Sequence, residues 1–152
     1  SYSRKLSDDV EVSRVGSLEE IRHFYDVQLE VFGGQQEPSQ ERLKRELQDC
    51  TGPDCPVVRL IAYHRGELAG VGAISLFEGC DCGMLWGGSV LESHRGRGCY
   101  TGLLQARADI CVARDISTMG LHAKADTSAP IVAAHGFERF GKRVDYSLDM
   151  RG

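Results

Sequence analysis

The sequence lacks several features that would assign a function directly. No run of apolar residues approaches the roughly 20 that a bilayer-spanning helix needs. No G-x4-G-K-[S/T] motif is present, which argues against a P-loop nucleotide hydrolase. Basic residues are not in excess, since the formal net charge is −4 at pH 7 and the pI is about 5.7. Nucleic-acid-binding domains are usually basic, so we expect neither a membrane nor a nucleic acid as a partner.

Cysteine is present, but not in the arrangement that binds zinc. The six cysteines stand at positions 50, 55, 80, 82, 99 and 111, with no C-x2-C pair among them. We therefore expect no metal site. Residues 1–10 are polar and lack the apolar core of a signal peptide, so we expect a cytoplasmic protein with reduced thiols. A bridge between Cys50 and Cys55, across a loop with Gly52 and Pro53, is the alternative.

What is present fits one globular domain over residues 1–152. The chain is 41% hydrophobic and 26% charged, which is ordinary for such a domain. Alternating or β-branched segments predict about seven strands, at 10–13, 57–63, 68–77, 84–91, 118–125, 137–140 and 144–150. Apolar residues at helical spacing, with capping and terminating signals, predict helices at 18–32, 39–48, 101–114 and 128–135.

The order of these segments predicts an α/β fold of the α+β type, with a mixed central sheet and flanking helices. Three consecutive antiparallel strands followed by a β-α-β crossover produce such a sheet. A doubly wound dinucleotide-binding domain would instead alternate strand and helix throughout.

The segment His94–Tyr100 is the most informative part of the chain. It reads His-Arg-Gly-Arg-Gly-Cys-Tyr and joins the predicted strand at 84–91 to the predicted helix at 101–114. A glycine-rich turn before a helix presents backbone N–H groups at the positive end of the helix dipole. Arg95 and Arg97 add charge suited to phosphate. The segment therefore predicts a site for a phosphate-bearing cofactor, with a bare strand-to-helix connection as the alternative.

Residues Val90–Tyr100 resemble the acetyl-CoA-binding segment of the GNAT superfamily of N-acetyltransferases, whose signature is [Q/R]-x-x-G-x-[G/A]. Arg95 and Gly98 match the first and fourth positions of that signature, and Tyr100 departs from its final small residue. The segment Ala133–Phe137 resembles a second landmark of the family, a short helix that ends in Gly-Phe. The order of elements matches the family along essentially the whole chain.

The resemblance implies the GNAT fold, with acetyl-CoA or coenzyme A as a co-substrate and no metal. The cofactor pyrophosphate would lie on the loop formed by Arg95, Gly96, Arg97, Gly98, Cys99 and Tyr100. The pantetheine arm would lie along the strand that ends at Val90, where this strand splays from residues 119–123. Gly87 and Gly88 mark either a bulge near this point or the close packing of a helix.

Asp126 stands where the family often has an Asn that touches the cofactor arm, so the resemblance implies a cofactor contact there. Ser128 as the cap of the short helix is the other interpretation of this segment. The chain follows the family less closely here than in the loop after Val90.

The resemblance also implies direct attack of an amine on the acetyl thioester, which needs a base and often an acid. The family frequently supplies the acid as a Tyr in the short helix, and that position is Val132 here. The catalytic candidates are Glu78 and Asp81, in the turn before the strand at 84–91, and His135, whose imidazole can donate or accept a proton. Turn carboxylates are usually solvated and His135 can cap its helix, so each has a structural alternative.

The function implied is N-acetyl transfer from acetyl-CoA to an amine of a small molecule or a peptide. A catalytically weak or inactive acyl-CoA-binding or regulatory domain of the same fold is the alternative. The helices between residues 18 and 47 line the acceptor side in this family, and a homodimer is compatible with it. Their acidic residues Glu19, Glu20, Glu30 and Glu46 would favour a cationic amine, unless they form only solvated helix faces. Trp86, the only Trp, is expected in the groove wall or in the core.

Overall fold

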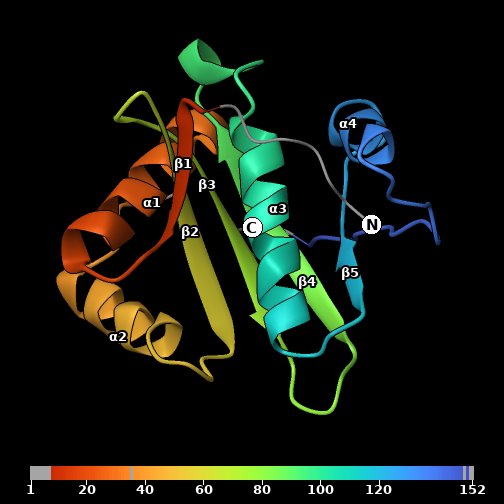
Figure 1. Cartoon of the computed structure of the whole chain (residues 1–152), viewed down its shortest axis with the longest axis horizontal. Helices are drawn as coiled ribbons and strands as arrows, with labels where there is room; N and C mark the ends of the chain where they lie inside the picture. Colours follow the sequence, from red (N-terminus) through yellow and green to blue (C-terminus); the bar gives the residue numbers. More distant parts are fainter. Residues whose placement is uncertain (1–7, 35, 149, 151–152) are drawn as a thin grey trace. The chain divides into compact units, whose positions relative to one another are not determined.

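A mixed sheet of five strands organises the first part of the chain, in the order β1-β2-β3-β4-β5 (Figure 1). The computed structural model describes residues 8–34, 36–148 and 150. The strands are β1 (Val10–Arg14), β2 (Val57–His64), β3 (Glu67–Leu76), β4 (Cys82–Val90) and β5 (Thr118–Leu121). The pairs from β1 to β4 are antiparallel, and β4 pairs with β5 in parallel.

Three α-helices cover this sheet, and a short 3-10 helix leads into the last of them. They are α1 (Leu18–Phe32), α2 (Gln40–Cys50), the 3-10 helix η1 (Glu92–His94) and α3 (Cys99–Ala113). Helices α1 and α2 share a buried cluster with Val71 and Ala73 of β3, whereas Arg107 of α3 lies against Gly72. Successive residues of a strand face opposite sides of a sheet, so α3 covers the other face.

Local signals set the ends of the first two helices as the sequence predicts. The Ser17 hydroxyl accepts a hydrogen bond from the backbone N–H of Glu20 (3.2 Å), and Ser39 caps α2 in the same way. A cap of this type contributes about 1 kcal/mol to stability. Helix α1 ends at Gly33, whose φ of +63° closes the helix in a conformation open to glycine. The β2–β3 turn likewise has positive φ at Arg65 and Gly66.

The prediction of about seven strands is wrong at the C-terminal end of the chain. Strand β5 ends at Leu121 instead of residue 125, and no strand occurs over 137–140 or over the described residues of 144–150. Asp149, which belongs to the last predicted strand, lies outside the described residues. The alternating side chains Val144, Tyr146, Leu148 and Met150 are 60%, 94%, 82% and 83% exposed. Alternation predicts a strand only where one face becomes buried, and here it does not.

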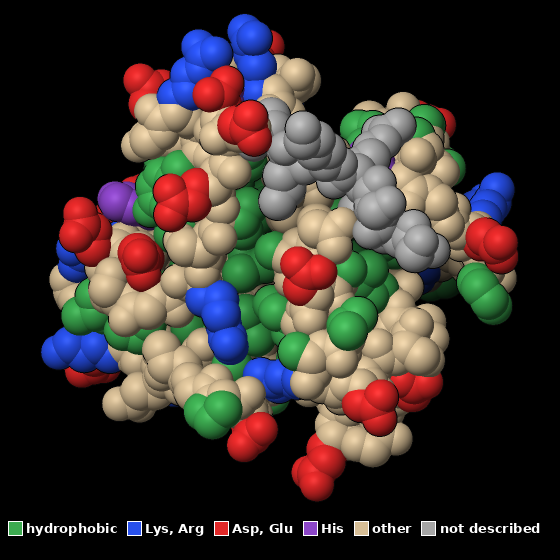
Figure 2. Space-filling view, viewed as in Figure 1, with side chains coloured by type: hydrophobic (Ala, Val, Ile, Leu, Met, Phe, Trp, Pro, Cys, Tyr) green, Lys and Arg blue, Asp and Glu red, His purple; other side chains and the backbone are tan. Residues whose placement is uncertain are grey.

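The chain divides into two compact units after Leu121. The second unit contains α4 (Ser128–Ala134), which ends before His135-Gly136 as predicted. All six cysteines are free thiols, including Cys50 and Cys55, so the structure has no bridge between these two. No helix of the described residues is long and apolar enough to cross a membrane. On the face drawn in Figure 2, acidic and basic side chains are interspersed.

Candidate active site

Strand β4 consists of two halves with different neighbours. Its first half, Cys82–Leu85, pairs with Thr118–Leu121 of β5. The ladder with β5 ends there, whereas the ladder with β3 continues to Val90. Residues 86–90 therefore have backbone N–H and C=O groups that β5 does not take up. The resemblance implies a splay from residues 119–123; of these, Met119, Gly120 and Leu121 pair with β4, and the ladder ends at Leu121.

A β-bulge lies in the second half of β4. Gly87 and Gly88 together stand opposite a single residue of β3, Gly72, because the register shifts at this point. Gly87 has a φ of +62°, a conformation that side chains with a Cβ rarely adopt. Its carbonyl accepts hydrogen bonds from Nε2 of Gln28 (2.6 Å) and from Oγ of Ser89 (3.2 Å). Of the two interpretations left open for these glycines, the bulge is present.

The side chain of Tyr100 packs against this bulge. Its Cε2 lies 3.4 Å from the position that a Cβ on Gly88 would occupy, and the Arg107 guanidinium lies 3.8 Å from the same point. The ring therefore turns toward β4, and Gly88 combines the bulge with close packing of α3. Burial raises the pKa of the Tyr100 hydroxyl, and the charge of Arg107 opposes this rise.

The loop after Val90 brings a helix N-terminus to the end of the splayed strand. Gly96 has a φ of +71°, and Gly98 is the N-cap of α3 with a φ of +89°. Gly98 has no side chain to cap the helix, and the first turn of α3 contains no acidic residue. Arg95 is exposed and its Nε donates to the carbonyl of Val90 (3.3 Å). Backbone N–H groups, the helix dipole and the arginine charge thus coincide in one exposed loop.

A cavity of about 440 Å³ opens between α1, α2, β2 and β4. This volume is typical of a small-molecule site. The cavity meets β4 at Trp86 and Gly87, so it reaches the bulge. Trp86 is 36% exposed and its Nε1 donates to Oγ of Ser75 (2.9 Å). The lining residues are Phe24, Tyr25, Gln28, Phe32, Arg42, Glu46, Arg59, Trp86 and Gly87.

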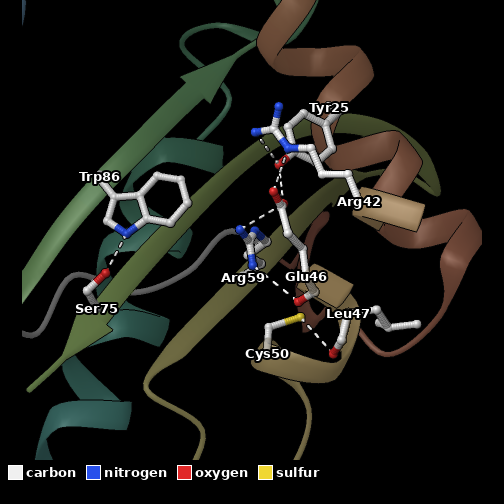
Figure 3. A network of polar contacts seen from close by, with 8 residues as sticks. All are labelled: Tyr25, Arg42, Glu46, Leu47, Cys50, Arg59, Ser75 and Trp86. Atoms are coloured by element: carbon white, nitrogen blue, oxygen red, sulfur yellow. Dashed lines mark hydrogen bonds and ion pairs between the residues drawn. The ribbon is translucent and has the colours of Figure 1, made fainter. Parts of the chain in front are cut away.

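Four of these residues form one polar network, the Glu46 cluster, which consists of Tyr25, Arg42, Glu46 and Arg59 (Figure 3). Oε1 of Glu46 accepts from Nε of Arg42 (2.8 Å). Oε2 of Glu46 accepts from Nη2 of Arg59 (3.0 Å) and from the Tyr25 hydroxyl. Across the cavity wall, the Arg59 guanidinium lies 5.4 Å from the ring centroid of Trp86 and 5.7 Å from that of Phe24.

The ionisation states within the Glu46 cluster follow from these contacts. Burial by itself raises the pKa of the Glu46 carboxyl, but the hydrogen bonds from Tyr25 and Arg42 and the charges of both arginines lower the pKa below its ordinary value. Burial and the bond to Glu46 raise the pKa of the Tyr25 hydroxyl. At neutral pH the cluster thus contains one carboxylate, two guanidinium groups and a neutral phenol.

Comparison with known proteins agrees with this geometry. A profile of the acetyltransferase (GNAT) family matches residues 18–141, which include the loop, β4 and every residue of the cavity. The chain belongs to the GNAT acetyltransferase family. Members of this family are acetyl-CoA-dependent acyltransferases, so the predicted fold, enzyme class and co-substrate are confirmed. No curated protein matches the chain by sequence.

Solved structures with the same fold include acetyltransferases of small amines. An aminoglycoside acetyltransferase from an uncultured soil metagenomic sample, in complex with sisomicin, has a TM-score of 0.79 at 12% identity over 93% of this chain and 98% of its own. The aminoglycoside N-acetyltransferase AAC(6')-Iy in complex with CoA has a TM-score of 0.73 at 19% identity, over 92% and 95%. Glucosamine-6-phosphate N-acetyltransferase from Arabidopsis thaliana has a TM-score of 0.71 at 13% identity, over 92% and 99%.

Within this GNAT domain, the two predicted carboxylates lie away from the bulge. Glu78 is exposed in the turn before β4. Asp81 accepts hydrogen bonds from the backbone N–H of Ser117 (2.6 Å) and from its hydroxyl, and thereby ties the start of β4 to β5. Gly87 is six positions after Asp81 in the sequence. Because a strand rises about 3.3 Å per residue, roughly 20 Å separates the two residues. The structure does not bring Glu78 or Asp81 to the loop or the cavity.

The other two predicted site residues belong to the second unit. Asp126 is exposed in the turn before α4. Nδ1 of His135 donates to the carbonyl of Ile131 (2.8 Å), which places His135 at the C-terminus of α4 as a cap. The expectation that Ser128 caps α4 is wrong. The N-cap is Thr127, and the Ser128 hydroxyl accepts a hydrogen bond from the backbone N–H of Lys124. Among the described residues, no group of three His, Cys, Asp or Glu side chains is arranged to hold a metal ion.

Three residues of the Glu46 cluster, Tyr25, Arg42 and Arg59, were not predicted as site residues, although the two arginines leave signals in the sequence. Arg42 and Glu46 are four residues apart on α2, a spacing that allows an ion pair. Arg59 is the only charged residue in the apolar stretch Val57–Tyr63. A single charge in an otherwise buried strand needs a partner, and Glu46 is that partner.

Proposed function

We propose that this GNAT domain transfers the acetyl group of acetyl-CoA to an amine of a small molecule bound in the cavity between α1, α2, β2 and β4. The observation that carries the proposal is the position of the bulge at Gly87. One side of β4 there lacks the β5 ladder and leads to the Arg95–Tyr100 loop, and Gly87 also lines the cavity. A thioester on β4 and an amine in the cavity would therefore meet at one point of the sheet.

In this proposal the loop binds the cofactor pyrophosphate through the backbone N–H groups around Gly98, with charge from Arg95 and Arg97. Residues 86–90 of β4, which do not pair with β5, bind the pantetheine arm by backbone hydrogen bonds. Arg95 then leaves the Val90 carbonyl that it contacts here and turns to the phosphates. Cys99 and Tyr100 contribute backbone groups, and burial of the Cys99 side chain raises the pKa of its thiol.

The reaction joins the acceptor nitrogen to the acetyl carbon and breaks the carbon–sulfur bond. The proton on nitrogen passes to a base, and the CoA thiolate leaves and takes up a proton. Glu46 is unsuited as the base, because three donors occupy its oxygens and its pKa is lowered. His135 remains our candidate for the base, on the resemblance to the family and on the ability of an imidazole to accept a proton. Asp126 remains a proposed contact of the cofactor arm.

A second function has one specific observation in its favour. The position at which the family frequently places its acidic Tyr is Val132, and this side chain is 6% exposed. A domain that binds acetyl-CoA without transferring the acetyl group would have this property. Glu78 and Asp81 would not replace the missing acid in either case, given their distance along β4 from the bulge.

The experiment is a screen of primary amines with acetyl-CoA, in which the acetylated amine is detected by mass spectrometry. This readout avoids the background that the protein's own thiols, such as the exposed Cys80, give with thiol reagents. We expect amine-dependent formation of the acetylated product. Binding of CoA without any acetylated product across the screen would favour the binding domain.

A further inference from the structure

The wall of the acceptor cavity carries net positive charge. Two guanidinium groups, Arg42 and Arg59, face one carboxylate, Glu46. The remaining lining side chains are aromatic or amide groups, apart from Gly87. The Tyr25 hydroxyl stays protonated because burial and Glu46 raise its pKa. One positive charge is therefore left without a counter-charge among the residues that line the cavity.

Glu46 is not available to receive a cationic ligand. Its two oxygens already accept from Arg42, Arg59 and Tyr25 (Figure 3). An incoming ammonium group would have to displace one of these donors, and would do so beside the other positive charges. The expectation that the acidic helix residues favour a cationic amine therefore does not hold for Glu46, the one of them that lines the cavity.

The arginines retain donors suited to an anion. Arg42 is 50% exposed and lines the cavity; its Nε donates to Glu46 and its Nη2 to the Tyr25 hydroxyl (3.5 Å). The side chain of Arg59 is 8% exposed, and its Nε–H is buried without a hydrogen-bond partner among the described residues. A guanidinium group has five N–H donors in a planar fork that fits a carboxylate or a phosphate. The half-exposed Arg42 therefore supplies the direct contact with an anion, and the charge of Arg59 adds to the attraction.

The rest of the cavity wall is apolar. The rings of Phe24 and Trp86 lie 6.2 Å apart, edge to face, and the Arg59 guanidinium lies near both. Phe32, on the same helix as Phe24, is 53% exposed and lines the cavity. Such walls accept the flat face of a ring, from either an aromatic group or a sugar.

We propose that the acceptor is an amine that also carries an anionic group, a carboxylate or a phosphate, and that Arg42 contacts this group, with the charge of Arg59 adding to the attraction, while the aromatic side chains contact its body. This inference rests on the proposed function, because it assigns the cavity to the acceptor. It sets the chain apart from an enzyme for polycationic acceptors, since a polycation would meet the uncompensated positive charge.

Trp86 permits a direct test, because it is the only Trp of the chain and lines the cavity. Its fluorescence is titrated with two matched pairs of ligands, phenylalanine against phenethylamine and glucosamine 6-phosphate against glucosamine. Sisomicin serves as the polycation. We expect the anionic member of at least one pair to bind about tenfold tighter than its counterpart or more, and sisomicin to bind no better than glucosamine. The pair that responds distinguishes carboxylate from phosphate.

Variants of α2 separate charge from packing. Arg42→Gln should abolish the preference for the anionic ligand, and Arg42→Lys should restore part of it. Arg45→Gln is the matched control on the same helix, because Arg45 is exposed and does not line the cavity. It should leave the preference unchanged. Thermal melts of the three variants establish that each is folded.

Each of three results would overturn the inference. The first is that in both pairs the counterpart binds as tightly as the anionic ligand or tighter, or that sisomicin binds better than glucosamine. The second is that neither anionic ligand changes the fluorescence. The third is an anion preference that survives Arg42→Gln. These titrations need neither acetyl-CoA nor turnover. The proposed function is judged separately by the acetylated product, so the failure of one proposal is distinguishable from the failure of the other.

Discussion

The two halves of β4 have the same neighbour on one side and different neighbours on the other. Cys82–Leu85 pairs with β3 and β5, and its residues pack into the core below α3, where Gly83 leaves room for Ile74 and Cys111. Residues 86–90 pair with β3 alone, contain the bulge, and lead to the Arg95–Tyr100 loop. The first half thus contributes to stability, whereas the second half contributes backbone groups and cavity walls.

The difference shows how backbone groups of one strand become available for the cofactor binding that we propose. A strand in the middle of a sheet has its hydrogen bonds filled on both sides, so it cannot bind a ligand through its backbone. Because the β5 ladder ends at Leu121, residues 86–90 have β3 as their only paired strand, and the chain then leads to the N-terminus of α3. Substitutions in the two halves should therefore have different consequences, and glycines in each half allow the contrast to be measured.

The largest effect is expected at the bulge. A Val at Gly87 would require a positive φ that β-branched residues avoid, and its Cβ would lie 3.0 Å from Nε2 of Gln28. Because the reacting atoms would shift, we expect Gly87→Val to lower the rate of acetyl transfer about a hundredfold. Steady-state kinetics at saturating acetyl-CoA measure the change.

Gly79→Val is the matched control for this prediction. Gly79 has a φ of +73° in the β3–β4 turn, and nothing lies within 4 Å of its Cβ position. It imposes similar backbone strain away from the bulge, at a cost of about 1–3 kcal/mol in stability. If both variants lost the same activity per folded molecule, the bulge would have no special role.

The next effect concerns the paired half of β4 and should appear in stability. A Cβ on Gly83 would lie 2.7 Å from Cδ1 of Ile74 and 2.8 Å from Sγ of Cys111. We expect Gly83→Val to reduce the free energy of unfolding by about 2 kcal/mol through overpacking. Urea denaturation measures this value. The affinity of the folded fraction for CoA should stay at the wild-type level, and a parallel loss of affinity would contradict the division of β4 into two roles.

A smaller effect, on cofactor affinity, is expected at the loop that follows residues 86–90 of β4. Gly98 has a φ of +89° at the N-terminus of α3, and a side chain there would also obstruct an approaching phosphate. We expect Gly98→Val to weaken CoA binding by about tenfold, measured by isothermal titration calorimetry. Gly66→Val, with a φ of +80° in the β2–β3 turn and open space around it, is the control and should bind CoA as the wild type does.

The smallest effect concerns Asp81. Hydrogen bonds from the Ser117 hydroxyl and then from its backbone N–H lower the pKa of this carboxyl. A lowered pKa in the folded state gives stability that is present above the pKa of the unfolded chain and is lost as the pH falls through the folded value. Asp81→Asn should therefore flatten the acid part of the stability profile and leave turnover at neutral pH unchanged. A tenfold or greater loss of turnover would restore Asp81 as a catalytic residue.

Much of the fold could be predicted because it depends on local signals. Ser17 and Ser39 start their helices and Gly33 ends one, as capping preferences require. The pair Gly87-Gly88 indicated either a bulge or the close packing of a helix, and both occur there; the run after Val90 predicted a loop leading into a helix. In each case the deciding interaction lies within a few residues of the signal.

The remainder depends on contacts between distant segments. The alternation in residues 144–150 predicted a strand, but alternation does not reveal whether a partner strand exists. The point where β5 leaves β4 is likewise set by packing, and no residue near Leu121 marks it in the sequence. The sequence left two interpretations of Glu46 open, a contact for a cationic amine and a solvated helix face, because its partner Arg59 lies on β2, 13 residues further along.

The most direct test of the account is the thermal unfolding of the wild-type protein with and without acetyl-CoA. The central claim is that this cofactor binds to residues 86–90, the half of β4 that does not pair with β5, and to the loop around Gly98. A ligand that binds only the folded state raises its stability by about 2.7 kcal/mol at a hundred times its Kd. We predict an increase in the melting temperature that grows with acetyl-CoA concentration and is reduced in Gly98→Val. A melting temperature that millimolar acetyl-CoA leaves unchanged would contradict the assignment.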